Sequence, residues 1–175
     1  MLDYMVLYQS NTGNTKKLAT AIFSALPGMS KDLRSIDELS DLPEARTYFI
    51  GFCVHRGTCS LEVGNLLSSI SLKNVALFGT CGAANQDNYY QNIENSARIW
   101  LEDDNHYLGG FFCQGKMPQM VRQKYESMLT GDEKHDYHLK MQMLNFDEAM
   151  IHPTKADLSH AEQFVKECLT KELPK

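Results

Sequence analysis

Six uncharged residues near the start of the chain could bind an anion. They read Ser10-Asn11-Thr12-Gly13-Asn14-Thr15 and lie between a short hydrophobic run and a segment with helical spacing. The first N–H groups of a helix attract negative charge, because they lack partners within the helix and the helix dipole is positive there. Hydroxyl and amide side chains add donors, and the glycine lets the backbone approach closely. The loop therefore predicts a site for a dianionic phosphate group.

Other phosphate-binding patterns fit the chain less well. The triphosphate-binding loop Gly-x-x-x-x-Gly-Lys-Ser/Thr would need a first glycine and a lysine that are missing here. The dinucleotide fingerprint Gly-x-Gly-x-x-Gly occurs nowhere in the chain. The competing interpretation of residues 10–15 is a polar loop in which Thr15 caps the following helix.

The surrounding segments alternate between strand-like and helix-like hydrophobic patterns. Short apolar runs that favour strands cover residues 4–8, 32–36, 47–54, 75–78 and 107–113. Helical segments lie between and after these runs. The first carries Leu18, Ile22 and Leu26 in an apolar stripe, and the second is capped by Ser60. A third covers about 89–102, and the last follows a capping box that begins at Thr154.

This alternation predicts the fold class. Strands that are apolar on both faces must be covered on both faces, which favours a parallel sheet between two helical layers. We expect a single α/β domain over residues 1–175, with a five-stranded parallel sheet in a three-layer sandwich. Residues 115–153 are too many for a simple connection. A helical insertion is expected there, with helices at about 118–129 and 138–150.

Taken together, these features resemble the flavodoxin family. Residues 10–15 are similar to that family's FMN phosphate loop, Ser/Thr-x-Thr-Gly-x-Thr. The resemblance covers nearly the whole chain and is closest to a bacterial branch with the motif aromatic-x-Asp-Lys-Gly-Thr, where this chain has Val54-His55-Arg56-Gly57-Thr58. Residues 78–83, 113–116 and 152–153 also resemble that branch. The resemblance implies FMN as cofactor and the strand order 2-1-3-4-5.

The resemblance also implies which residues hold the cofactor. The phosphate would lie on Ser10, Asn11, Thr12, Gly13, Asn14 and Thr15. The flavin ring would lie between residues 55–59 and 80–90, which offer His55, Arg56, Gly57, Thr58, Thr80, Cys81, Gly82 and Tyr89.

Individual roles near the ring follow from the same resemblance. The peptide of Gly57 would face flavin N5, and backbone groups at Thr58, Cys81 and Gly82 would meet the pyrimidine edge. Tyr89 or its neighbour Tyr90 could lie against the ring, although both could equally serve as the start of a helix. Trp100, amid hydrophobic residues of the same helix, is expected in the core and not at the flavin.

Arg56 and the missing acidic residue after Gly82 depart from many flavodoxins. A cation beside the ring would stabilise reduced, anionic flavin and so raise the potential of the second reduction step. The alternative is that Arg56 is a solvated surface charge.

Three functions remain open. The leading one is an electron carrier that binds FMN and shuttles between a reductase and an acceptor enzyme, with no acid–base catalytic residue. The alternative is an FMN-dependent oxidoreductase that reduces quinones or nitro compounds with NAD(P)H. A third is an interaction module without flavin, which the intact loop at residues 10–15 argues against.

Composition limits the partners and the compartment. The formal charge of −5 argues against nucleic-acid binding, and no apolar run approaches the ~20 residues of a membrane span. No signal peptide is expected, because Asp3 stands where a basic leader would lie. Five dispersed cysteines fit a reducing cytoplasm. The histidines lack metal spacing, so no metal site is expected.

Two further groups of residues have open interpretations. Cys53, Cys81 and Cys113 end consecutive strands and could form a thiol patch, or could simply be packed there, and Cys59 is expected to be the reactive thiol. Residues 117–150 hold six of the nine methionines. They would form a cap over the cofactor, a docking face for a partner, or an extra helical layer.

Overall fold

The computed structural model describes residues 1–84 and 86–172. Its centre is a five-stranded parallel sheet in the order β2-β1-β3-β4-β5, so the predicted fold class and strand order are confirmed. The strands are β1 (Leu2–Tyr8), β2 (Lys31–Ser35), β3 (Ala45–Cys53), β4 (Asn74–Cys81) and β5 (His106–Gln114).

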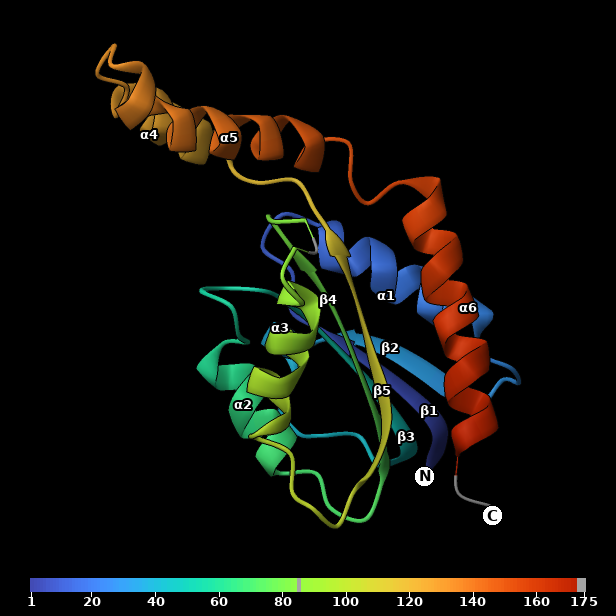
Figure 1. Cartoon of the computed structure of the whole chain (residues 1–175). Coiled ribbons are helices and arrows are strands. Elements are labelled where there is room, and N and C mark those ends of the chain that lie inside the picture. Colours follow the sequence, from blue (N-terminus) through green and yellow to red (C-terminus); the bar gives the residue numbers. More distant parts are fainter. Residues whose placement is uncertain (85, 173–175) are drawn as a thin grey trace.

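Helices cover both faces of this sheet (Figure 1). One layer holds α1 (Asn14–Ala25) and α6 (Lys155–Lys171), and the other holds α2 (Leu61–Ser68) and α3 (Tyr89–Arg98). A single 3-10 turn, η1 (Ile36–Glu38), follows β2. No helix in the described ranges is long and apolar enough to cross a membrane.

The core lies on both sides of the sheet because successive side chains of a strand point to opposite faces. In β3, Phe49 packs toward α1 and α6, whereas Ile50 packs toward α2 and α3. In β4, Phe78 packs toward α1 and α6, whereas Leu77 packs toward α2 and α3. The central strands are therefore apolar on both faces, which is the pattern that predicted a covered parallel sheet.

Local capping explains where most helices begin. The Ser60 hydroxyl accepts a hydrogen bond from the N–H of Val63, and Thr154 and Asp157 form the expected capping box of α6. Thr15 does not cap α1, because Gly13 occupies the cap position with a φ of 82°, in the left-handed region that glycine tolerates. The alternative interpretation of Thr15 as an N-cap is therefore wrong.

Helix α3 is shorter than expected and changes the position of Trp100. It ends at Arg98, and an acidic run from Glu102 to Asp104 follows, which is unfavourable at the negative end of a helix dipole. Trp100 is 38% exposed, and a Cβ atom at Gly64 of α2 would lie 2.7 Å from its Cδ2. The ring therefore covers α2 at the surface, and the prediction of a core tryptophan is wrong.

Two helices occupy the segment between β5 and α6. They are α4 (Gln119–Ser127) and α5 (Glu133–Ala149), which pack on each other and project from the body as an arm (Figure 1). Helix α5 begins five residues before the expected start, because the Asp132 carboxylate caps it by accepting from the N–H groups of Lys134 and His135. We call residues 119–149 the α4–α5 arm.

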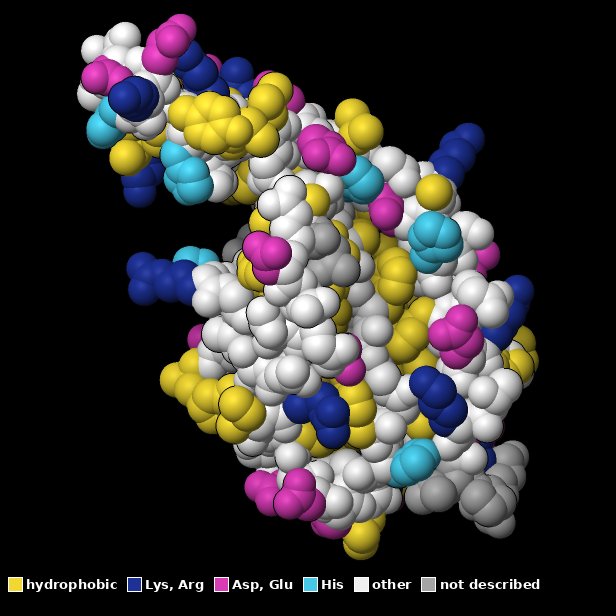
Figure 2. Space-filling model, viewed as in Figure 1, with side chains coloured by type: hydrophobic (Ala, Val, Ile, Leu, Met, Phe, Trp, Pro, Cys, Tyr) yellow, Lys and Arg dark blue, Asp and Glu magenta, His cyan; other side chains and the backbone are white. Residues whose placement is uncertain are grey.

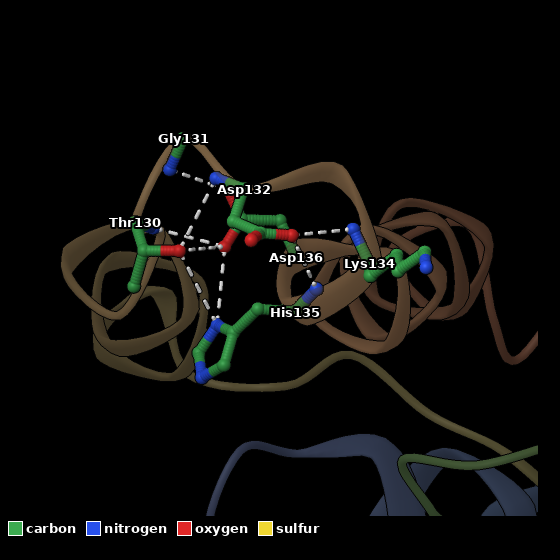
Figure 3. A network of polar contacts seen from close by, with 6 residues as sticks. All are labelled: Thr130, Gly131, Asp132, Lys134, His135 and Asp136. Atoms are coloured by element: carbon green, nitrogen blue, oxygen red, sulfur yellow. Dashed lines mark hydrogen bonds and ion pairs between the residues drawn. The ribbon is translucent and has the colours of Figure 1, made fainter.

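The tip of the α4–α5 arm is held by a buried carboxylate (Figure 3). Asp136 accepts hydrogen bonds from the N–H groups of Thr130 and Gly131, at 2.9 and 2.8 Å, and from the Thr130 hydroxyl at 3.0 Å. These donors favour the ionised form and lower the pKa of Asp136 to about 2. Along the arm, Arg122 of α4 pairs with Asp147 of α5 at 2.6 Å and joins the two helices.

Candidate functional site

A cavity of about 340 Å³ opens at the carboxyl edge of the sheet. In open α/β sheets, ligands bind outside the carboxyl ends of the strands where the strand order reverses. The order here reverses at β1 and β3, and the cavity lies against the loop after β1 and the ends of β3 and β4. Its wall is formed by Asn11, Thr12, Asn14, Cys53, Val54, His55, Thr80, Cys81, Gly82, Gly115, Lys116, Met117, Pro118 and Val121.

The loop at residues 10–15 leads directly into the amino end of α1. The cap residue Gly13 makes no side-chain bond to the helix, and no acidic residue lies in the first turn. The Ser10 hydroxyl accepts from the N–H of Lys16 at 3.3 Å. The exposed Lys16 and Lys17 add positive charge to this turn. Helix dipole and side chains thus favour an anion at the same place.

Asn14 links this loop to the segment that follows β5. It is 4% exposed, and its Nδ2 donates to the Thr12 hydroxyl at 2.8 Å and to the carbonyl oxygen of Lys116 at 3.0 Å. The adjacent Thr15 is fully buried, with its hydroxyl 2.9 Å from that of Thr80 in β4. The loop is therefore tied to β4 and to the segment after β5.

The loop after β3 is a tight turn. His55 and Thr58 exchange both backbone hydrogen bonds, at 2.9 and 3.2 Å, and the two residues between them, Arg56 and Gly57, have φ angles of 52° and 82°. Two left-handed residues in a two-residue turn are typical of a type I′ geometry. Arg56 is exposed to solvent, and Gly57 is partly buried but has no heavy atom within 4 Å of the position that a Cβ atom would take.

The loop after β4 is held by the α4–α5 arm. Asn145 of α5 donates from Nδ2 to the carbonyl oxygen of Gly82 at 2.8 Å, and its Oδ1 accepts from the N–H of Ala84 and from the Gln114 side chain, both at 3.2 Å. A Cβ atom at Gly82 would lie 2.4 Å from Sδ of Met117, so the segment after β5 packs directly on this loop. The arm is thereby linked to the cavity wall.

The charge of the cavity wall contrasts with that of the chain. The protein carries a formal charge of −5, yet none of the wall residues in the described part of the chain is acidic, and Lys116 contributes a positive charge. Cys81 stays a neutral thiol, because burial raises its pKa to about 12, and it donates to the carbonyl oxygen of Ala83. The wall thus suits an anionic ligand with an aromatic or apolar part.

The structure brings together seven of the fourteen candidate residues in this wall: Asn11, Thr12, Asn14, His55, Thr80, Cys81 and Gly82. Ser10, Gly13 and Thr15 shape the loop behind it, and Arg56, Gly57 and Thr58 belong to the adjacent turn. Tyr89 is half-buried against the core under α2 and α3 and is not part of the wall. Asn85, within the expected ring-flanking loop, lies outside the described residues.

Two expectations about cysteines change. Cys59 is buried in the core and burial raises its pKa, so the prediction that it is the reactive thiol is wrong. Cys81 and Cys113 pack in core clusters on opposite faces of the sheet. Cys53 of β3 and Cys113 of β5 both pair with Thr80 of β4, so this strand separates them. The three thiols do not form one patch, and packing accounts for Cys81 and Cys113.

Residues from the end of β5 complete the site. Gly115, Lys116, Met117, Pro118 and Val121 line the cavity, although sequence patterns did not single out their role. The only signal was the likeness of residues 113–116 to the bacterial branch. Among the described residues, no group of three or more His, Cys, Asp or Glu side chains could hold a metal ion.

Comparison with known proteins agrees with this geometry. The sequence matches the family Flavodoxin_3, a flavodoxin domain, over residues 5–166. The flavodoxin-like domain-containing protein BilS of Clostridioides difficile is 34% identical over 171 residues, which cover 95% of this chain and 96% of that protein. BilS of Clostridium symbiosum is 26% identical over 182 residues and 94% of each chain.

The fold agrees as well. The flavodoxin of Streptococcus pneumoniae has a TM-score of 0.61 at 16% identity, with 98% of this chain and 100% of that chain covered. The order of the five parallel strands, the position of the loop at residues 10–15 and the family match all lead to the same assignment. The chain belongs to the flavodoxin family.

Proposed function

We propose that the chain binds FMN non-covalently and carries electrons between a reductase and an acceptor enzyme. The observation that supports this most directly is the amino end of α1, which begins after Gly13, has no acidic residue in its first turn and adjoins the cavity. A phosphate group suits this position, and FMN combines such a group with an apolar ring. The flavin would supply the redox chemistry when bound, while the protein positions and tunes it.

Different residues would bind the phosphate group and the flavin ring. Residues 10–15 would hold the phosphate with hydroxyl, amide and backbone N–H donors. Thr58, Cys81 and Gly82 would offer backbone groups to the ring. Gly57 has a φ of 82°, and glycine tolerates both signs of φ, so its peptide could turn toward flavin N5 once the hydrogen bond from the Thr58 N–H to the His55 carbonyl oxygen is broken.

A second candidate function has one observation in its favour. Met117, Pro118 and Val121 close one side of the cavity, which a substrate pocket over the ring would require. An FMN-dependent reductase of quinones or nitro compounds would use NAD(P)H directly. An electron carrier would instead need a separate reductase, and its exposed ring edge would face its partners.

The proposed setting is the reducing cytoplasm. All five cysteines are free thiols, and four of them are buried. Such a set fits a compartment in which thiols are kept reduced. The partners we propose are a donor of the flavodoxin or ferredoxin reductase type and an acceptor enzyme.

Calorimetric titration with FMN tests the proposal. The expected result is one site with micromolar or tighter affinity and a yellow complex. A protein that takes up no FMN at micromolar concentration would overturn it. Photoreduction of the complex then separates the two functions, because a carrier accumulates a one-electron stage and a reductase passes directly to the two-electron form. Steady NAD(P)H oxidation with quinone and no added reductase would favour the enzyme.

A further inference from the structure

Helix α5 has a second apolar face that stays exposed to solvent in the described part of the chain. Its buried side is formed by Leu139, Phe146 and Ala149. Its exposed side carries three apolar residues, Tyr137 at 65%, Met141 at 46% and Leu144 at 60% exposure, and Ile151 just beyond the helix is 67% exposed. Figure 2 shows hydrophobic side chains gathered on the surface of the arm. Large exposed apolar patches of this kind mark interaction sites.

The spacing of this exposed face is that of a coiled coil. Tyr137, Met141, Leu144 and Ile151 are separated by four, three and seven residues. Two charged residues continue the same pattern, Lys134 before the apolar residues and Glu148 among them. Apolar residues that repeat at alternating steps of three and four pack best against another helix of the same kind. The face therefore fits a helix as its partner.

Charged residues on this face indicate that the partner helix is a second copy of α5. Lys134 lies at the start of the exposed face of α5 and Glu148 lies at its end, both exposed. Within the described residues, neither side chain forms an ion pair or a side-chain hydrogen bond. When two copies of α5 lie antiparallel, Lys134 of each copy comes beside Glu148 of the other. A parallel pair would place like charges together, which is unfavourable.

We propose that two copies of the chain associate through antiparallel pairing of their α5 helices. The α4–α5 arm stands away from the sheet, so two arms can meet along α5 with the bodies on opposite sides (Figure 1). A helix of 17 residues is about 25 Å long, at ~1.5 Å per residue. One such pair buries less than the ~1,200 Å² of a standard interface, so the dimer is expected to dissociate in the micromolar range.

Sedimentation velocity between 1 and 300 μM tests this association. These concentrations span about two and a half decades of the micromolar range. The wild-type chain should shift from monomer to dimer as its concentration rises. A chain that remains a monomer at the highest concentration overturns the proposal. Leu144→Glu should be monomeric throughout, with an unchanged far-UV circular dichroism spectrum because Leu144 is exposed.

Charge reversal then identifies the helix and its direction. Lys134→Glu and Glu148→Lys should each weaken the dimer roughly 10-fold, because each change replaces two attractive pairs with two repulsive ones. The double variant restores both pairs and should recover wild-type affinity. Matched reversals on the exposed face of α6, Lys166→Glu and Glu162→Lys, should leave the affinity unchanged. A dimer that is insensitive to the reversals at 134 and 148, or one that the double variant fails to restore, overturns the antiparallel α5 pairing.

Discussion

Asn14→Asp separates a phosphate site from a merely structural loop. The substitution keeps the size and shape of the side chain but replaces its NH₂ group with a carboxylate oxygen. Both hydrogen bonds of Asn14 use that NH₂ group, to the Thr12 hydroxyl at 2.8 Å and to the Lys116 carbonyl at 3.0 Å. An aspartate would therefore lose the bond to the carbonyl and place a negative charge at the amino end of α1.

The size of the effect follows from these contacts. Loss of the donor and exposure of a buried carbonyl to an unpaired carboxylate should lower the free energy of unfolding by about 2–4 kcal/mol. A carboxylate roughly 6 Å from a dianionic phosphate, at an effective dielectric of ~40 to ~80, opposes binding by about 1.4–3 kcal/mol. FMN affinity should thus fall roughly 10- to 100-fold.

Parallel titrations with FMN and with riboflavin give the decisive comparison. Riboflavin lacks the phosphate, so its affinity should change far less than that of FMN. Asn105→Asp is the matched control, because the side-chain NH₂ group of Asn105 likewise donates to backbone carbonyl oxygens. These are the carbonyls of Ile70 at 2.8 Å and Glu102 at 3.1 Å, at the opposite edge of the sheet. This control should lose stability but keep its preference for FMN over riboflavin.

One result would refute the reasoning. If Asn14→Asp loses stability like the control and keeps its wild-type ratio of FMN to riboflavin affinity, no phosphate lies at the amino end of α1. Equal weakening of both ligands would instead indicate a general distortion of the cavity. Thermal unfolding of each variant without ligand measures its loss of stability, so that the measured affinities can be corrected for any unfolded fraction.

Three further predictions address other parts of the molecule. Arg56→Gln should lower the potential of the second reduction step of bound FMN by about 30 mV, because it removes a solvent-exposed positive charge ~6 Å from the ring. If spectroelectrochemistry shows no shift, Arg56 lies away from the ring. Leu72 is exposed with a φ of 55°, so Leu72→Asn should raise the melting temperature by about 1–4 °C, whereas Leu61→Asn on helix α2 should give no gain. Asp136 has a lowered pKa of about 2 against an ordinary value of 3.8, so its stabilisation of the arm tip is present above about pH 4 and is lost as the pH falls toward 2. The hydrogen-exchange protection factor of the Thr130 amide, which is corrected for the intrinsic pH dependence of exchange, should fall over that range in the wild type, and Asp136→Asn should show low protection already at neutral pH.

Features that depend on a few neighbouring residues could be read from the sequence. The caps at Ser60 and Thr154 involve side chains and N–H groups three residues away, so a local pattern specifies them. The covered parallel sheet followed from strands without a polar face. Residues 10–15 were identified because a helix start and its preceding loop are contiguous in the chain.

Burial of single side chains was predicted less well. Two predictions were wrong for this reason, Cys59 as the reactive thiol and Trp100 as a core residue. Whether a residue near the end of an element is covered depends on which other element passes over it, and that is not encoded within a short segment. The same reason explains why Tyr89, at the start of α3, turned toward the core and not into the cavity wall.

The sequence by itself thus determined the fold class, the strand order by resemblance, and the loop that can bind an anion. Only the tertiary structure decided how the cavity is closed. Met117 covers Gly82, and Asn145 of the α4–α5 arm binds the carbonyl of Gly82 from 63 positions away in the chain. These contacts form between segments whose separation in sequence is large, and their geometry is set by the packing of the whole sheet and not by the local preference of either segment.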